Sequence, residues 1–426
     1  MNPERAGVKA GMDASAGQAG AAPTSASERI GLLDALRGLA LAGIFLVNIE
    51  WFSRPWQEFG HGMALGLAGI DLAVAWVVHV LVSGKFWVLF SLLFGMGFAV
   101  MMERASASGR GVRIYLRRLS ALLVFGVAHA LLLWVGDILH GYAIAGLLLL
   151  MLRNAAPSVQ LALGLTLYLG IYALSLMGAL LLMVVPPDMM GITPESLAGN
   201  ARAGEVAAAA YAGGGFVEVT AQRVQDFGFL LSNIWGVVPM ALGVFLIGSW
   251  LLRTGYMADV AGNRRFFARM AAWCLPAGLV LTLWSAAIAT GHPEGAANGT
   301  WVLAMSLHGL GALPVTLGGV ALLALAWESR AGARLLGALA PAGRMALTNY
   351  LFQSLVGSLV FYGYGLAMWG RLGPAAMAAL ALGVFALQVV ASRWWLARFR
   401  FGPVEWLWRW LTYGARPPMR RAAPAA

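Results

Sequence analysis

The sequence predicts an all-α protein, a polytopic bundle of about ten transmembrane helices with both the N- and C-termini in the cytoplasm. Of its 426 residues, 60% are hydrophobic and only 11% are charged, whereas a soluble domain carries about 25% charged residues. The hydrophobic residues form blocks, many of which reach the roughly 20 residues that a helix needs to cross a bilayer. Arginines gather in the connections that a ten-span topology places on one side, and cytoplasmic loops have this charge bias.

Taken in chain order, the apolar blocks predict spans at 36–52, 84–102, 116–135, 138–152, 159–185, 227–252, 270–290, 301–327, 345–366 and 374–396. The fourth block is short, so we expect a helix that is tilted or partly buried in protein. Residues 70–82 are also apolar. An eleventh crossing there would place Arg29 and Arg37 outside, so we expect an interfacial or re-entrant helix.

The net charge is +11, and nearly all of the basic residues are arginines. They cluster in 103–118, in 253–269, in 330–344 and from 393 onward. Retention of these loops in the cytoplasm accounts for the charge. The expected partner is therefore the lipid bilayer and not a nucleic acid.

The remaining segments divide the chain into regions. Residues 1–28 are rich in Ala, Gly and Ser and predict a disordered tail. Residues 29–412 form the transmembrane domain, and 413–426 a cytoplasmic tail. Residues 186–226 form an external loop in which Pro194 to Tyr211 has helical composition. This loop is either a cover over an external cavity or a plain connector.

Polar residues at membrane depth are costly and often functional. On the outer side the topology places Asn48, Lys85, His129 and Asp137. On a continuous helix His129 and Asp137 would lie about 12 Å apart, so they meet only if the helix breaks, for example at Gly136. An Asp137 contact would orient His129 as a general base. Alternatively, Asp137 caps the helix that begins at 138 and His129 bonds a neighbouring helix.

On the inner side the topology places Arg37, Arg344 and Asn349. Arginine forks suit phosphate groups, so these residues are candidates for binding the phosphates of a co-substrate. Snorkelling to the interface is the alternative for any one arginine. No HExxH, P-loop or GxSxG motif occurs, and there is a single cysteine. We therefore expect no metal site and no required cofactor.

Several segments resemble the YeiB-like family of bacterial inner-membrane proteins. They are LLDALRGLALAGIFLVNI at 32–49, GKFWVLFSLLFGMGF at 84–98, AHALLLWVGDILHGYAIAG at 128–146, GRMALTNYLFQS at 343–354 and GPVEWLWRWLT at 402–412. The first is also similar to the opening of transmembrane acyltransferases, the group of acyltransferase-3 proteins and the lysosomal heparan glucosaminide acetyltransferase. The Arg-x10-His motif of acyltransferase-3 proteins appears here as Arg37 and Asn48. Asn48 cannot act as a base, and His129 is the candidate replacement.

Three functions follow as hypotheses. In an acyltransferase, cytosolic acyl-CoA binds Arg37 and Arg344, and His129, oriented by Asp137, deprotonates an acceptor on an envelope glycan or lipid. Asn48 or Lys85 then stabilises the oxyanion. In a transporter, His129 and Asp137 relay protons for a small molecule. In a structural protein, both polar layers serve helix packing only.

Overall fold

The computed structural model describes residues 31–58, 62–64, 66–106, 111–288 and 297–421. The tail predicted at 1–28 lies outside this range. The named elements of the described chain are all helices, and an isolated bridge pairs Phe399 with Arg420. The membrane-length and shorter apolar helices are α2 (Gly31–Trp51), α3 (Gly69–Val77) with the π-helix η4 (Val78–Val82), α4 (Lys85–Ser106), α5 (Gly111–Leu132), α6 (Leu139–Met151), α7 (Pro157–Val184), α10 (Ile234–Arg253), α11 (Arg264–Ile288), α12 (Gly299–Trp327), α15 (Ala346–Phe361) and α16 (Pro374–Arg398).

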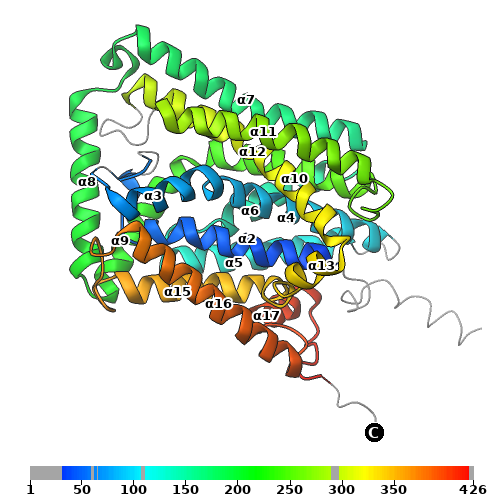
Figure 1. Ribbon diagram of the computed structural model, residues 1–426. Coiled ribbons are helices and arrows are strands. Elements are labelled where there is room, and N and C mark those ends of the chain that lie inside the picture. Colours follow the sequence, from blue (N-terminus) through cyan, green and yellow to red (C-terminus); the bar gives the residue numbers. More distant parts are fainter. Residues whose placement is uncertain (1–30, 59–61, 65, 107–110, 289–296, 422–426) are drawn as a thin grey trace, which may run out of the picture.

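The remaining helices lie at the two ends of the bundle. They are η3 (Trp56–Glu58), η5 (Pro187–Met190), α8 (Pro194–Gly213), α9 (Phe216–Ser232), α13 (Arg330–Gly337), α14 (Ala340–Arg344) and α17 (Pro403–Tyr413). Figure 1 shows α2 in the centre of the bundle, with α8 standing across one end and α13 and α17 near the other. We call these the α8 end and the arginine end. The arginine end is named for Arg37, Arg118, Arg153, Arg253, Arg344 and Arg409.

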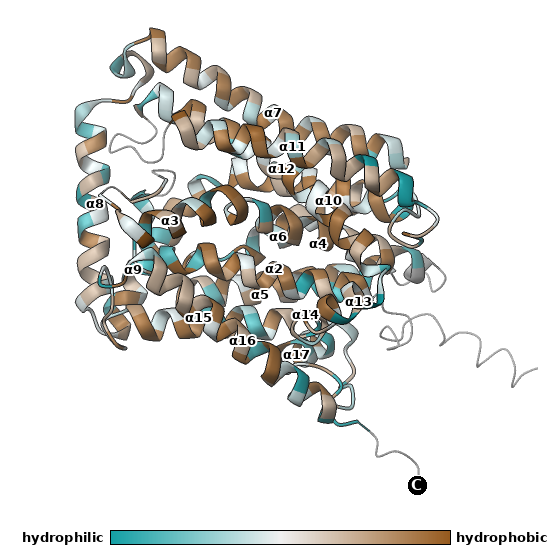
Figure 2. Cartoon of the chain, in the orientation of Figure 1, coloured by the Kyte–Doolittle hydropathy of each residue, from teal (hydrophilic) through white to brown (hydrophobic). Residues whose placement is uncertain are grey.

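Eight helices of the described chain are long and apolar enough to cross a membrane, and α6 and α15 are shorter apolar helices. Together they overlap all ten predicted spans. Brown, apolar ribbon covers the sides of the bundle in Figure 2, as expected for a surface that faces lipid. The number of crossings and the sides on which the termini lie stay predictions.

Several helix ends differ from the predicted span ends by about five to seven residues. The span expected from 227 begins at Ile234, because Asn233 ends α9 and starts α10. Residues 70–82 form α3 and η4, which pack beside α2 and α16. Helix α3 has no buried residue, whereas His79 and Val80 of η4 are buried. Helices α3 and η4 form one long apolar unit with α4, Gly69 to Glu103, interrupted by a turn. The interfacial and the re-entrant form of this segment both stay predictions.

Close helix approach depends on small residues. A Cβ on Gly278 of α11 would lie 2.8 Å from the carbonyl oxygen of Gly311 on α12. A Cβ on Gly311 would likewise lie 2.8 Å from the carbonyl oxygen of Gly278. Small residues of this kind let membrane helices pack backbone against backbone. Both helices are thereby held at a separation that larger side chains would prevent.

Candidate functional site: a histidine–aspartate cluster beside an arginine-lined cavity

The turn between α5 and α6 brings His129 and Asp137 together. Helix α5 ends at Leu132, and the Leu133 and Trp134 amides both donate to the His129 carbonyl oxygen, at 2.9 Å each. The chain then folds back, so that His129 Nδ1 lies 2.7 Å from Asp137 Oδ2. The helix therefore breaks as the contact requires, but it ends four residues before Gly136.

Asp137 also holds the start of α6. Its Oδ1 accepts a hydrogen bond from the His140 backbone N–H at 2.9 Å and lies 3.0 Å from His140 Nδ1. The two roles considered for Asp137, helix cap and histidine partner, are thus filled by the two oxygens of one carboxylate. Both imidazoles donate to it through Nδ1, and in a neutral imidazole with this tautomer Nε2 is an acceptor.

His129 is arranged as a general base would be. Its side chain is 1% exposed, and that of Asp137 is fully buried. Within the described chain, His129 Nε2 has no hydrogen-bond partner. The ring packs against Tyr350 of α15, with centroids 5.0 Å apart, and against Trp134 at 6.5 Å. A basic nitrogen oriented by a carboxylate and free of protein donors can accept a proton from a substrate.

Tyr350 connects this cluster to a large cavity. The cavity has a volume of about 1180 Å³ and is lined by α2, α4, α5, α6, α15 and α17. Its wall carries Ile138, Leu139 and Tyr350 next to the histidine–aspartate cluster. The rest of its inner wall is apolar or aromatic, with Leu41, Ile44, Phe94, Phe98, Leu122 and Tyr142 among its residues.

The opposite part of the cavity, at the arginine end, is charged. Arg37 Nη1 lies 2.7 Å from Asp34 Oδ1, and the Arg118 guanidinium stacks on the Trp408 ring at 3.8 Å from its centroid. Six arginines line the cavity against three carboxylates, namely Asp34, Glu103 and Glu405. This surplus of positive charge next to an apolar wall suits an amphipathic anion.

Glu405 fixes α17 as one wall of this cavity. Its two carboxylate oxygens accept hydrogen bonds from Thr348, from the backbone N–H at 2.9 Å and from the hydroxyl at 2.5 Å. The Thr348 hydroxyl oxygen in turn accepts from the Val404 N–H at 3.1 Å. Burial raises the pKa of the Glu405 carboxyl, and the Thr348 hydrogen bonds oppose this change.

The α8 end is closed by the loop expected at 186–226, which is mostly helical. Asp226 accepts hydrogen bonds from Gln57 Nε2, Gln222 Nε2 and the Tyr211 hydroxyl, at 3.1, 3.1 and 2.7 Å. Arg223 donates to the Leu132 carbonyl at 3.0 Å, which ties α9 to the end of α5. The segment is therefore packed onto this end of the bundle, and its position on the external side and over a cavity stays a prediction.

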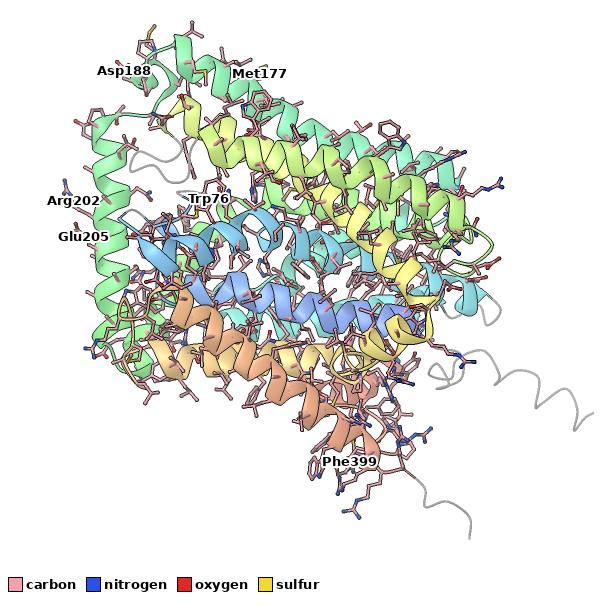
Figure 3. All side chains as sticks on the ribbon, viewed as in Figure 1. Trp76, Met177, Asp188, Arg202, Glu205 and Phe399 are labelled. Carbon is pink, nitrogen blue, oxygen red and sulfur yellow. The ribbon has the colours of Figure 1, made fainter. Side chains whose placement is uncertain are left out.

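The two faces of α8 differ. Gly204, Ala207 and Tyr211 of α8 are buried against the bundle. Arg202 and Glu205 point away from it in Figure 3. Helix α8 therefore lies across the end of the bundle with small residues and Tyr211 inward and charged residues outward.

The structure separates the other residues expected at the site. Arg37 and Arg344 both line the cavity. Asn349 is not among the residues that line the cavity. Its side-chain amide donates to the Ala342 carbonyl and to the Ser392 hydroxyl, at 3.1 and 3.0 Å. Lys85 donates to the His79 carbonyl at 3.1 Å, away from the cavity lining. Asn48 is half-buried on α2 and makes none of the hydrogen bonds observed among the described residues.

Sequence reasoning missed several residues of the site. Tyr350 lies in the quoted segment GRMALTNYLFQS but has no charge to single it out. Gly126 lies one turn before His129, and a Cβ there would be 2.6 Å from Asp137 Oδ1 and 2.5 Å from the His140 amide nitrogen. Trp408 and Glu405 lie in GPVEWLWRWLT, where the mixture of acidic, basic and aromatic residues was the available signal. No group of three metal-ligating side chains occurs within the described ranges.

Comparisons with known proteins give relatives that span the chain. Residues 251–415 match the model of a family described as "Protein of unknown function (DUF418)". The "Uncharacterized protein YxaH" of Bacillus subtilis (strain 168) is 33% identical over 94% of this chain and 98% of its own. The "Uncharacterized protein YeiB" of Escherichia coli (strain K12) is 32% identical, over 92% and 98% respectively. No solved structure matches the chain.

Proposed function

Because the chain belongs to the YeiB-like (DUF418) family, we propose for it an activity that its own cavity and histidine cluster support, transmembrane acyl transfer. The protein lies in the bacterial inner membrane with its arginine end in the cytoplasm. An acyl-CoA enters the cavity from that end. The acceptor is a hydroxyl or amine of an envelope glycan or lipid on the other side.

One observation carries the proposal, a cavity that is cationic at one end and apolar at the other, with Tyr350 between it and His129. A volume of about 1180 Å³ exceeds the roughly 300–1,000 Å³ of ordinary small-molecule sites, as a ligand with a long acyl chain requires. The phosphates of CoA would bind Arg37 and Arg344, and the acyl chain would lie along the phenylalanines of α4. The thioester is then directed toward Tyr350.

The chemistry needs one proton acceptor. The acceptor's oxygen or nitrogen attacks the thioester carbonyl carbon while His129 Nε2 removes its proton. The C–S bond breaks, and the thiolate of CoA leaves with that proton, so that His129 returns to its neutral form. Asp137 stabilises the imidazolium formed in between. A positioned base of this kind contributes about 10²–10⁴-fold to the rate.

The test uses the full-length protein in lipid nanodiscs with palmitoyl-CoA and acetyl-CoA. We expect calorimetric binding of palmitoyl-CoA, weakened at least tenfold by Arg37→Gln. The matched control Arg202→Gln, on the exposed face of α8, leaves binding unchanged. His129→Ala is expected to keep binding and to lose thioester hydrolysis or transfer by at least a hundredfold. Absence of CoA binding rules out the function, and undiminished turnover in His129→Ala rules out the base.

A second candidate is transport of a small molecule, with His129 and Asp137 as a proton relay. The interrupted unit of α3, η4 and α4 favours it, since transporters often carry their substrate sites at broken helices. Proton-gradient-dependent uptake into proteoliposomes, abolished by Asp137→Asn and requiring no CoA, would distinguish transport from acyl transfer.

A further inference from the structure

A second buried polar cluster lies where the long unit Gly69 to Glu103 is interrupted. The turn at Ser83 and Gly84 separates η4 from α4, and Gly84 has a φ of +76°. This left-handed conformation favours glycine. Helix α4 therefore begins abruptly at Lys85, inside the bundle.

Contacts with α12 give the position of the break. The Thr316 hydroxyl donates to the Lys85 carbonyl at 2.9 Å, and His308 Nε2 lies 3.2 Å from the Ser83 carbonyl oxygen. Thr316 and His308 lie on either side of the middle of α12, which is long enough to cross a membrane. The amino end of α4, with its partial positive charge and free N–H groups, is therefore level with the middle of α12.

Three basic side chains surround this helix end. Lys85 is 3% exposed, His79 7% and His308 9%. The two imidazole rings contact each other with centroids 4.3 Å apart, and Lys85 Nζ donates to the His79 backbone carbonyl at 3.1 Å. The π-helix η4, which carries His79, is a form that often marks functional sites.

Among the residues that the structure describes, the cluster has unmet hydrogen-bonding capacity and no counter-charge. Within the described chain, His79 Nε2 and His308 Nδ1 have no hydrogen-bond partner. The charged groups that act on His308 are Lys85 and His79, which are both basic. None of the observed ion pairs includes any of the three side chains. Buried positive groups are costly unless an anion pairs with them.

We propose that the break before α4 is a binding site for an oxyanion, the carboxylate or phosphate group of a small ligand. Its donors are Lys85 Nζ, His79 Nε2–H, His308 Nδ1–H and the first-turn amides of α4. Because His308 Nε2–H already donates to the Ser83 carbonyl, His308 binds the oxyanion with protons on both ring nitrogens. The site is separate from the arginine-lined cavity. The proposal is therefore compatible with acyl transfer and with transport.

The test follows the imidazole nitrogens directly. Full-length protein with ¹⁵N-labelled histidine, in nanodiscs at constant ionic strength set with chloride, is titrated with acetate and separately with inorganic phosphate. Solid-state NMR resolves the ring nitrogens of the chain's 6 histidines, with His79→Gln and His308→Asn supplying assignments. We expect the ring ¹⁵N signals of His79 and His308 to shift saturably with anion concentration, and those of His129 to stay unchanged. The two ring nitrogens of bound His308 should both show the chemical shifts of a protonated imidazolium nitrogen. Acetate and phosphate affinities then separate a carboxylate from a phosphate ligand.

Two variants separate this site from the cavity. Lys85→Met is expected to weaken the oxyanion affinity at least tenfold, whereas Arg37→Gln, at the cavity, leaves it unchanged. Lys85→Arg should retain binding, and it serves if Lys85→Met does not fold. The proposal is overturned if neither acetate nor phosphate, at concentrations up to about 100 mM, shifts the His79 and His308 signals. It is also overturned if Lys85→Arg and Lys85→Met bind the anions with equal affinity. Shifts that chloride alone produces would also overturn the oxyanion assignment.

Discussion

At the scale of single residues, one carboxylate organises the candidate site. Asp137 accepts from two imidazoles and from the first turn of α6. The sequence places His129 and Asp137 eight positions apart, which predicts a contact only if α5 ends early. The contact therefore depends on tertiary packing of the turn, which the spacing of the two residues does not determine.

Gly126→Ala tests how tightly that packing is fitted. An added Cβ would press on Asp137 Oδ1 and on the His140 amide, both under 3 Å away. Overpacking of this kind costs about 1–3 kcal/mol, so we expect a lower unfolding midpoint in nanodiscs and a displaced His129 ring signal. Gly141→Ala is the control, because nothing lies within 4 Å of its Cβ. Equal unfolding midpoints for Gly126→Ala and Gly141→Ala would contradict the close packing of Gly126 against Asp137 and His140.

Glu405→Gln tests the raised pKa of the Glu405 carboxyl. A carboxyl whose pKa is higher in the folded than in the unfolded state stabilises the fold below its unfolded pKa of about 4.3. That contribution is lost as the pH rises through the folded pKa. The glutamine keeps acceptor and donor atoms for Thr348 but does not titrate.

We therefore expect the unfolding midpoint of Glu405→Gln to rise relative to the native protein between pH 4 and pH 7. Thermal unfolding followed by tryptophan fluorescence measures the difference. Glu195→Gln, on the exposed surface of α8, supplies the control profile. A constant difference across this range would contradict the raised pKa.

At the scale of elements, the cover formed by α8 and α9 depends on buried polar contacts as well as on apolar packing. Its sequence has helical composition, so the helix itself could be predicted. Its placement could not, because Gln57 lies 169 residues from Asp226 in the chain and meets it only in the folded state. The same holds for Lys85, whose backbone carbonyl accepts a hydrogen bond from Thr316 on α12.

Asp226→Asn is expected to loosen this cover. The carboxylate faces three donors, and an asparagine would turn its own N–H₂ toward at least one of them. Loss of hydrogen bonds to a charged group costs about 1.5–3 kcal/mol, which corresponds to roughly tenfold to a hundredfold faster amide exchange. Hydrogen–deuterium exchange mass spectrometry over residues 194–232 measures it. Asp188→Asn, exposed on η5, is the control, and unchanged exchange in Asp226→Asn would show that apolar contacts alone hold the cover.

At the scale of the whole molecule, hydrophobic block length predicted all ten apolar helices, because the cost of exposing backbone in lipid leaves little choice of structure. The same reasoning grouped polar residues by depth only. It grouped Arg37 with Arg344, and both line the cavity. It also placed Lys85 and His129 in one layer, although their contacts belong to different clusters. Depth describes only the position of a residue along the membrane normal. To predict which side chains meet in a site, one must also know how each helix is rotated and which helices are its neighbours.

The orientation in the membrane decides the direction of any transfer or transport, and it can be tested directly. The single cysteine, Cys274 in α11, is replaced by serine to give an unreactive background. Ala209→Cys then places a thiol on the exposed face of α8, and Ala331→Cys places one on exposed α13. With the arginine end in the cytoplasm, a membrane-impermeant maleimide should label Ala209→Cys in intact spheroplasts and Ala331→Cys only after permeabilisation. The opposite pattern would mean that the arginine-lined cavity opens outward, and a cytosolic acyl-CoA could not reach it.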